Sequence, residues 1–486
     1  MKVDFDFGFD WKTVRSGVER RLSVDVRSLA ALRLSLGLLV VADLVLRSRD
    51  LVAHYTDSGV FPRSALRDFS PVFSQLPLHA VSGETWFVAA LFVVAGVAAI
   101  LLAIGHATRL AALVTVVLLV SLQMRNPVVL NGGDSVLRRL LIWSLFLPLG
   151  GVWSVDSSRR EREVPTRIAT PATAAVLIQV VVIYSVNAVF KLRNDVWMGG
   201  DAGRYVFSID RLTVGVGEVL AQHPDIGLLG VTDYFWLGLV VSSPLLLVLK
   251  GRRRGLLVSV FVLAHLGMLG SLNLGLFPLI SIAGLIPFVP TSFWNHVSER
   301  IGTDVSVASE TGHGVVKSRL RPASAVVVVL IGFLVFWNAA SLGYVDVSED
   351  SPVDPEKRAW DMFAKPPESD GWYVVRGSVS GSASGSESLE PETVNAFPVS
   401  ESFEKPPDVD STYPSHRWMV YLVDLQRREY ADLRPYFGGY VCERWDGRAT
   451  ETRLRNVTVY YVEQPTRFGE PEPILRRKLG EYSCND

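Results

Sequence analysis

Long runs of apolar residues constrain this chain more than any other feature. Nine runs have nearly the length of a membrane span: 28–47, 84–104, 107–123, 135–150, 171–190, 232–249, 255–270, 273–290 and 322–343. A helix needs about 20 apolar residues to cross a bilayer, and lipid excludes open strands because their amides would stay unpaired. We therefore expect an α-helical polytopic membrane protein with about nine transmembrane helices and a small C-terminal α+β exterior domain.

Basic residues between the runs predict the orientation. Four clusters precede the first, fifth, seventh and ninth runs: Arg15 to Arg27, Arg159 to Arg162, Lys250 to Arg254, and Lys317 to Arg321. Positive charge stays on the cytoplasmic side of a membrane, and nine spans with the N-terminus inside put all four clusters there. The expected division is a cytoplasmic segment 1–27, a transmembrane domain 28–343 and an extracytoplasmic domain 344–486. The first run starts only near Ser28, so we expect a retained span rather than a cleaved leader.

The net charge of −1 hides an asymmetry along the chain. From Val345 to the end there are 17 Lys and Arg against 26 Asp and Glu, a balance of −9, which leaves +8 for the rest. The positive charge lies in short clusters between apolar runs, so we expect the lipid bilayer as a partner and no nucleic acid.

The acidic tail is long enough for its own core. Aromatic and β-branched residues predict strands at Trp372–Val375, Trp418–Val423 and Val457–Val462, and Leu425–Tyr436 reads as an amphipathic helix. The Gly/Ser tract 377–388 reads as a loop.

Both cysteines, Cys442 and Cys484, lie in this tail, and no spacing suits a metal site. An exterior location favours a disulfide between them, and two buried free thiols are the alternative.

Several polar residues fall within or beside the apolar runs, where burial is costly and function is the usual reason. Lys191, Asp43 and His265 lie inside runs, and Asn187 precedes Lys191 by one helical turn. Arg125, Asn126, Asn131 and Asp134 flank the outer loop between the third and fourth runs. Together they predict a polar pocket open to the exterior.

Structural roles are the alternatives for the same residues. Lys191 could extend to the interface, and Asp43 could pair with Arg125. His265 could be a satisfied core histidine, and Asp134 could cap the following helix.

Several motifs together resemble the HTTM family, the membrane domains similar to vitamin K-dependent gamma-carboxylase. These are Arg125-Asn126-Pro127-x-x-Leu130-Asn131-Gly132-Gly133-Asp134, Leu145 to Gly150 with Trp153-Ser154-Val155-Asp156, Tyr55-Thr56-Asp57-x-Gly59-Val60, and Lys191-Leu192 followed by Trp197 and Gly199. The resemblance covers roughly residues 22–300.

The resemblance implies an enzyme that oxygenates a reduced menaquinone or vitamin K-type quinol and couples this to proton abstraction and carboxylation of a peptide or protein substrate outside the membrane. Lys191 matches the lysine thought to deprotonate the quinol, and His265 resembles a histidine of the same enzymes. Burial disfavours the charged form of a lysine, which would make it a usable base. Arg125, Asn126, Asn131, Asp134 and Trp197 are the candidate cofactor contacts, and no metal is expected.

Two positions depart from the animal enzymes. Gly133 and Gly151 stand where those enzymes have histidine, and the tail is much shorter than their exterior region. A non-catalytic scaffold that binds partners through its tail, or a transporter, therefore remains an alternative function.

Overall fold

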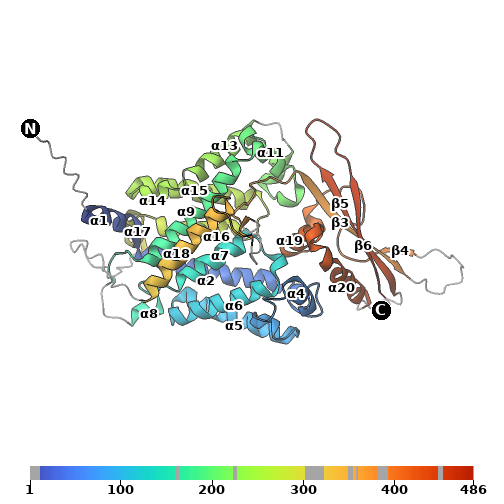
Figure 1. The fold of residues 1–486 in the computed structure, drawn as a ribbon, viewed down its shortest axis with the longest axis horizontal. Coiled ribbons are helices and arrows are strands. Elements are labelled where there is room, and N and C mark those ends of the chain that lie inside the picture. The colour runs from blue at the N-terminus through green and yellow to red at the C-terminus, as the bar shows by residue number, and fades with distance from the viewer. Residues whose placement is uncertain are drawn as a thin grey trace, which may run out of the picture.

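The computed structural model describes residues 11–159, 164–222, 227–301, 322–348, 354–356, 359–379, 392–446 and 453–484. Helices form a bundle, and a smaller domain with a sheet lies at one end of it (Figure 1). Within the predicted basic clusters and tail loop, Arg160, Arg162, Lys317, Arg319, Arg321 and residues 380–388 lie outside the described ranges.

Six helices in the described part of the chain are long and apolar enough to cross a membrane. They are α2 (Val26–Ser48), α5 (Thr85–Ile104), α6 (Thr108–Arg125), α9 (Pro171–Leu192), α15 (Gly251–Ser271) and α18 (Pro322–Ser341). They correspond to six of the nine predicted runs, so the chain is a multi-pass membrane protein.

The other three runs form shorter or broken helices. Run 135–150 is α7 (Gly132–Ser144), whose 13 residues extend about 20 Å at 1.5 Å per residue. Run 232–249 divides into α13 (Leu228–Val241) and α14 (Leu245–Val248) at Pro244, and run 273–290 contains α16 (Phe277–Leu285) and η4 (Ile286–Phe288). The last pair bends by 101° into α17 (Thr291–Ile301) after Pro290. Proline lacks an amide hydrogen and clashes with the preceding turn, which explains these breaks.

Shorter elements connect these helices. They are α1 (Trp11–Leu22), β1 (Val24–Asp25), α3 (Leu51–Tyr55), α4 (Arg63–Phe69), η1 (Leu78–Ala80), η2 (Pro127–Val129), α8 (Val155–Ser158), β2 (Arg167–Ile168), α10 (Asp195–Gly199), α11 (Ala202–Phe207), η3 (Asp210–Leu212) and α12 (Val216–Ala221).

Basic segments meet at one end of the bundle. Arg27 donates to Asn295 Oδ1 at 2.8 Å, and Arg254 donates to the carbonyl oxygen of Arg21 at 2.9 Å. Arg167 donates to Thr291 Oγ1 at 3.0 Å. The C-terminal domain lies at the opposite end (Figure 1), so the bundle has a basic end and a domain-bearing end.

Small residues let α2 and α5 approach closely. A Cβ atom added to Gly37 would lie 2.7 Å from Ala103 Cβ and 2.6 Å from the carbonyl oxygen of Ala99. Lipid provides no hydrophobic driving force for membrane helices to associate, so they depend on van der Waals contact, and small residues let their backbones come close enough for it.

The C-terminal domain contains a four-stranded antiparallel sheet in the order β4-β3-β5-β6. The strands are β3 (Ser369–Val379), β4 (Glu392–Asn395), β5 (Leu454–Pro465) and β6 (Leu475–Ser483), and the helical segments are η6 (Asp410–Thr412), α19 (His416–Leu425), η7 (Arg428–Leu433) and α20 (Arg434–Asp446). Two of the predicted strands lie within β3 and β5.

The predicted strand Trp418–Val423 is wrong, because these residues belong to α19. Ser415 Oγ accepts from the amide of Trp418 and starts the helix, and Trp418, Tyr421, Leu422 and Leu425 are all buried at helical spacing. The predicted helix Leu425–Tyr436 is also misplaced, since η7 occupies half of it and α20 starts only at Arg434.

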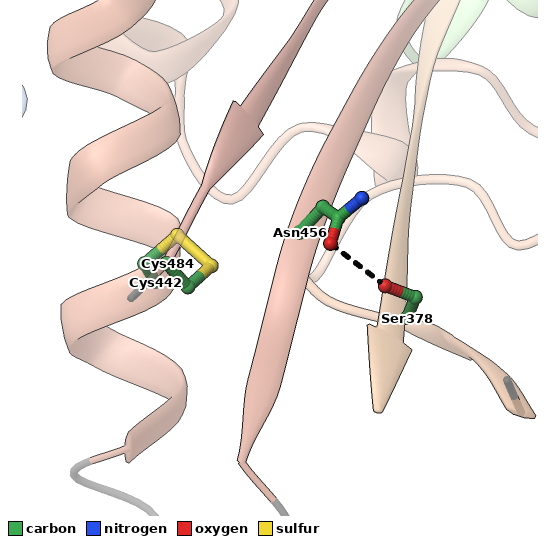
Figure 2. The surroundings of a disulfide bond; sticks show 4 residues. All are labelled: Ser378, Cys442, Asn456 and Cys484. Carbon is green, nitrogen blue, oxygen red and sulfur yellow. Dashed lines mark hydrogen bonds between the residues drawn. A yellow bond between two sulfur atoms is a disulfide. The ribbon is translucent and has the colours of Figure 1, made fainter. Parts of the chain in front are cut away.

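A disulfide joins α20 to the end of β6. Figure 2 shows Cys442 on the helix bonded to Cys484, which follows the strand. The same view shows Asn456 on β5 accepting a hydrogen bond from Ser378 Oγ of β3 at 3.3 Å. The crosslink ties the last strand of the sheet to the helix that packs on it.

Candidate functional site

Lys191 lies in the last turn of α9, at the domain-bearing end of the bundle. A capping box of Thr170 and Thr173, with Pro171 in the first turn, starts this helix, and an apolar sequence carries it across. The Lys191 side chain is buried, with 1% of the residue exposed. A buried amine needs hydrogen-bond partners, and the partners of the Lys191 amine lie outside α9.

Backbone carbonyls from a segment much later in the chain accept hydrogen bonds from the Lys191 amine. Its Nζ donates to the carbonyl oxygens of Phe363 at 2.7 Å and Met362 at 3.3 Å, and it lies 3.6 Å from the ring centroid of Trp197. Phe363 has a φ of +50°, a left-handed conformation uncommon outside glycine. This backbone conformation accompanies two successive carbonyls that both accept from one amine.

Neighbouring side chains fix the same carbonyl segment. Asn187, one turn before Lys191, donates to the carbonyls of Met362 at 2.8 Å and Trp360 at 3.2 Å, and Trp197 Nε1 donates to Phe363 at 2.7 Å. The Trp360 ring lies 4.1 Å from the Arg139 guanidinium. The segment 360–363 is thus attached to the bundle by four side chains.

A cavity of about 410 Å³ lies beside the Lys191 amine. Its walls are mainly apolar and come from α7, α9, α10, α11, α12, α13, α15 and α16, with Met362 and Phe363. Val216 of α12 and Phe235 of α13 line it and are also 63% and 53% exposed on the outside of the bundle. The cavity therefore reaches the lateral surface of the helix bundle at these two residues.

His265 lies behind the cavity wall. Its Nδ1 lies 2.8 Å from the carbonyl oxygen of Phe261, so this nitrogen carries the hydrogen and donates. Nε2 is then the acceptor for the Tyr184 hydroxyl at 3.3 Å, and it is Tyr184 that lines the cavity. Tyr184 thus connects the predicted catalytic histidine to the space beside Lys191.

Sequence reasoning did not identify Tyr184 or Asp233, both of which line the cavity. Asp233 stands near the start of α13 and is 4% exposed. An acidic residue in an apolar run was the available signal, the same one that marked Asp43.

A second cluster of polar residues lies where α19 meets the bundle. Arg417 donates to Asp43 Oδ1 at 2.8 Å and to Asp134 Oδ2 at 2.6 Å. Arg47 donates to Asp43 Oδ2 at 2.7 Å and also contacts Asp134 and Tyr55. The predicted pairing of Asp43 with Arg125 is therefore wrong, because Arg47 lies one turn away on the same helix and Arg417 approaches from the C-terminal domain.

Arg125 and Asn126 hold α3 and the segment that follows it. Arg125 donates to the carbonyl oxygen of Phe61 at 2.7 Å and lies 3.8 Å from Asp57, and Asn126 donates to the carbonyl oxygen of His54 at 2.9 Å. These two residues therefore shape the domain-bearing end of the bundle.

Asn131 joins the bundle to the C-terminal domain. It forms a capping box with Asp134 at the start of α7, and its Nδ2 lies 3.1 Å from His416 Nε2. Burial, with the neighbouring Arg417 charge, lowers the pKa of His416 to about 4, so this imidazole is neutral at pH 7.

The predicted cofactor contacts thus divide into two groups. Within the described ranges, Trp197 lines the cavity with Lys191, whereas Arg125, Asn126, Asn131 and Asp134 do not. These four make structural contacts, and a cofactor role for them stays a prediction.

The two glycines at departing positions lie in different places. A Cβ on Gly133 would lie 3.1 Å from Phe277 Cα, so this position is next to a residue of the cavity wall. Gly151 lies in the turn after α7, where carbonyls of Leu149 and Val152 accept from Arg33. Only the Gly133 departure therefore bears on the cavity.

A family model described as the HTTM domain matches residues 22–294. Comparisons with curated proteins and with solved structures found no match. Lys191, Trp197, Asp233 and His265 all lie inside the matched range, whereas the carbonyl segment 360–363 and Arg417 lie beyond it.

Proposed function

Because the chain belongs to the HTTM family, which is related to the carboxylases, we propose that it is a membrane enzyme that oxygenates a reduced quinol, with Lys191 as its base. One observation carries this proposal. The Lys191 amine, held by the carbonyls of Met362 and Phe363, adjoins an apolar cavity that reaches the lateral surface of the bundle. A lipid-soluble ligand would enter such a cavity from the bilayer.

The cavity suits a reduced menaquinone or vitamin K-type ring. Pockets for small molecules have volumes of about 300–1,000 Å³, with mostly apolar walls and a few polar groups. The volume of about 410 Å³ lies in that range, and its polar groups include those of Lys191, Tyr184 and Asp233. The quinol, when bound, would give up four electrons to O₂, with one oxygen atom retained in the quinone epoxide and the other released as water.

The protein would position the ring and move a proton. A base must lie within hydrogen-bond reach of the proton it removes, and the Lys191 Nζ is the basic atom beside the cavity. Its present acceptors are backbone carbonyls, so a lone pair becomes available only when the amine is neutral and turned toward the ligand. The Trp197 ring, 3.6 Å from Nζ, would form one side of that position.

A carboxylation step would require a peptide substrate at the domain-bearing end. We include it as the finer part of the proposal, because family resemblance is its support and Gly133 leaves the cavity wall without the histidine of the animal enzymes. Supplying bicarbonate and a glutamate-rich peptide in the same assay tests it directly.

We also propose nine passes, with the N-terminus in the cytoplasm and the C-terminal domain outside. The nine are the six long helices together with α7, α13 with α14, and α16 with η4, each counted as one short pass. The support is that Arg21, Arg27, Arg167 and Arg254 gather at the end opposite the C-terminal domain.

The experiment is an assay of quinone products in membranes that contain the full chain. Reduced naphthoquinol is supplied with O₂, and epoxide is measured by mass spectrometry. Lys191→Met should abolish the epoxide, since the side chain keeps its length but has no base. Lys250→Met, an exposed lysine near the basic end, is the matched control and should leave the yield unchanged. Equal yields from all three proteins, or none above empty membranes, would overturn the proposal.

A non-catalytic scaffold is the second candidate function. The observation in its favour is the ion-pair cluster that fixes α19 to the bundle, which would hold a partner-binding domain in a defined orientation. This alternative predicts that Lys191→Met has no effect on the cellular phenotype of the protein, whereas deletion of the C-terminal domain abolishes that phenotype.

A further inference from the structure

Asp233 is the acidic side chain that shares the cavity with Lys191. It is 4% exposed, and the walls around it are mainly apolar. No ion pair joins Asp233 to Lys191 in the described part of the chain, although the two charges act on each other. An amine and a carboxylate that line the same cavity without forming an ion pair leave room for a third polar group between them.

The hydrogen bonds that Asp233 makes to the backbone use only some of the acceptor positions of its carboxylate. Its Oδ2 accepts from the amide of Gly203 at 2.8 Å, and the amide of Ala202 also donates to the carboxylate. These bonds attach the start of α11 to α13, which is a structural role. An ionised carboxylate has about four acceptor positions, so two remain beyond the backbone contacts.

We propose that Asp233 is a ligand-anchoring residue that accepts a hydrogen bond from a hydroxyl of the quinol and so selects the reduced form of the ring. This inference rests on the proposed function and names the chemistry by which the same site distinguishes its substrate. A quinol has hydroxyl hydrogens to donate, whereas a quinone has only carbonyl oxygens. A carboxylate attracts the first and repels the second, because it has no hydrogen to give when ionised.

The arrangement assigns different tasks to the two charged groups. Lys191 can interact with an oxygen of either redox form, since an amine N–H donates to hydroxyl and carbonyl oxygens alike. An ionised Asp233 can only accept hydrogen bonds, so it interacts favourably with the reduced form and not with the quinone. After oxidation the product no longer satisfies Asp233, which favours its release toward the lateral opening at Val216 and Phe235.

The test compares the affinity of both redox forms for the full chain in lipid nanodiscs. The probes are 2-methyl-1,4-naphthoquinol under anaerobic conditions and its oxidised quinone. Binding is followed by quenching of tryptophan fluorescence, since Trp197 and Trp236 line the cavity. The native chain should bind the quinol about 10- to 100-fold more tightly than the quinone, because hydrogen bonds to charged groups are strong.

Asp233→Asn should bring that ratio close to one. The asparagine oxygen still accepts from Gly203, so the attachment of α11 is kept while the negative charge is removed. Asp201→Asn is the matched control, because Asp201 stands at the start of α11, pairs with Arg204 at 3.3 Å and does not line the cavity. This control should keep the native ratio.

A ligand analogue that lacks the hydroxyl hydrogens tests the same contact on the native chain, without relying on the folding of a variant. The dimethyl ether of the same naphthoquinol has no hydroxyl hydrogen and should bind the native chain about as weakly as the quinone. Native binding with no preference for the quinol, or an equal loss of both forms in Asp233→Asn, would overturn the role of Asp233 while the proposed function stands. Absence of binding of every probe to the native chain would overturn both.

Discussion

Replacing Arg417 by methionine tests how the C-terminal domain is fixed to the helix bundle. Two guanidinium groups and two carboxylates meet in this cluster, so its charges balance. The side chains of Asp43, Asp134 and Arg47 are no more than 3% exposed, and that of Arg417 is 11% exposed. Arg417→Met leaves two buried carboxylates with one arginine.

The magnitude follows from the burial of the cluster. Removing one partner of a buried ion pair costs about 3–5 kcal/mol, because the remaining charge stays uncompensated. We expect that loss in the free energy that keeps α19 against the bundle. At 1.4 kcal/mol for each factor of ten, local opening should become roughly 100- to 4,000-fold more frequent.

Amide hydrogen exchange along α19 measures this opening. The amide of Met419, which donates to the Ser415 carbonyl at 2.9 Å, should exchange faster in Arg417→Met by that factor. Arg427→Met is the matched control: this arginine is 52% exposed and pairs with Asp424 at 3.3 Å, so the change should be below about 1 kcal/mol.

A double variant separates charge from packing. Arg417→Met with Asp43→Asn leaves Arg47 and Asp134 in balance, so exchange should slow toward the native rate. Exchange within about fivefold of native in Arg417→Met, or a double variant that opens more than the single one, would contradict the reasoning.

Three further predictions concern pH, packing and orientation. Burial raises the pKa of Asp424 to about 6, so the folded domain binds this proton more tightly than the unfolded chain. The domain therefore loses stability as pH rises from about 4 to 6, on the order of 3 kcal/mol, and Asp424→Asn should abolish that part of the pH dependence of melting. Gly217→Ala would place a Cβ 2.0 Å from a carbonyl oxygen of α15 and should cost about 1–3 kcal/mol in thermal stability, whereas Gly267→Ala, with open space around it, should stay near native. In intact cells, an impermeant thiol reagent should label Glu404→Cys but not Arg253→Cys, and the reverse pattern would refute the proposed orientation.

Apolar patterning was sufficient to locate the long membrane helices, because lipid requires helix wherever a run is long enough. It was less informative for run 135–150, where the capping box at Asn131 and Asp134 starts a helix that ends at Ser144. Capping residues and prolines determine where a helix begins and ends, and hydropathy alone does not predict their effect.

Composition misled the assignment of α19. Trp418, Tyr421 and their β-branched neighbours are typical of strands, yet their burial follows a helical period set by contacts with the bundle and the sheet. Tertiary packing overrode local preference here.

Contacts between residues far apart in the chain could not be predicted from sequence spacing. Arg417 lies 374 residues from Asp43, and the carbonyls that hold Lys191 lie about 170 residues after it. Lys191 and Trp197 could be grouped from the sequence because they are six residues apart, whereas Asp233 joins them only through the packing of α13 against α9.

Incorporation of oxygen from ¹⁸O₂ into a naphthoquinol product tests the central claim most directly. Membranes that contain the native chain should yield a quinone epoxide that carries one labelled oxygen atom, since the reaction takes its oxygen from O₂. Membranes with Lys191→Met at equal protein level should yield none above background. Labelled epoxide in equal amount from both would contradict the role of Lys191, and its absence from the native membranes would contradict quinol oxygenation itself.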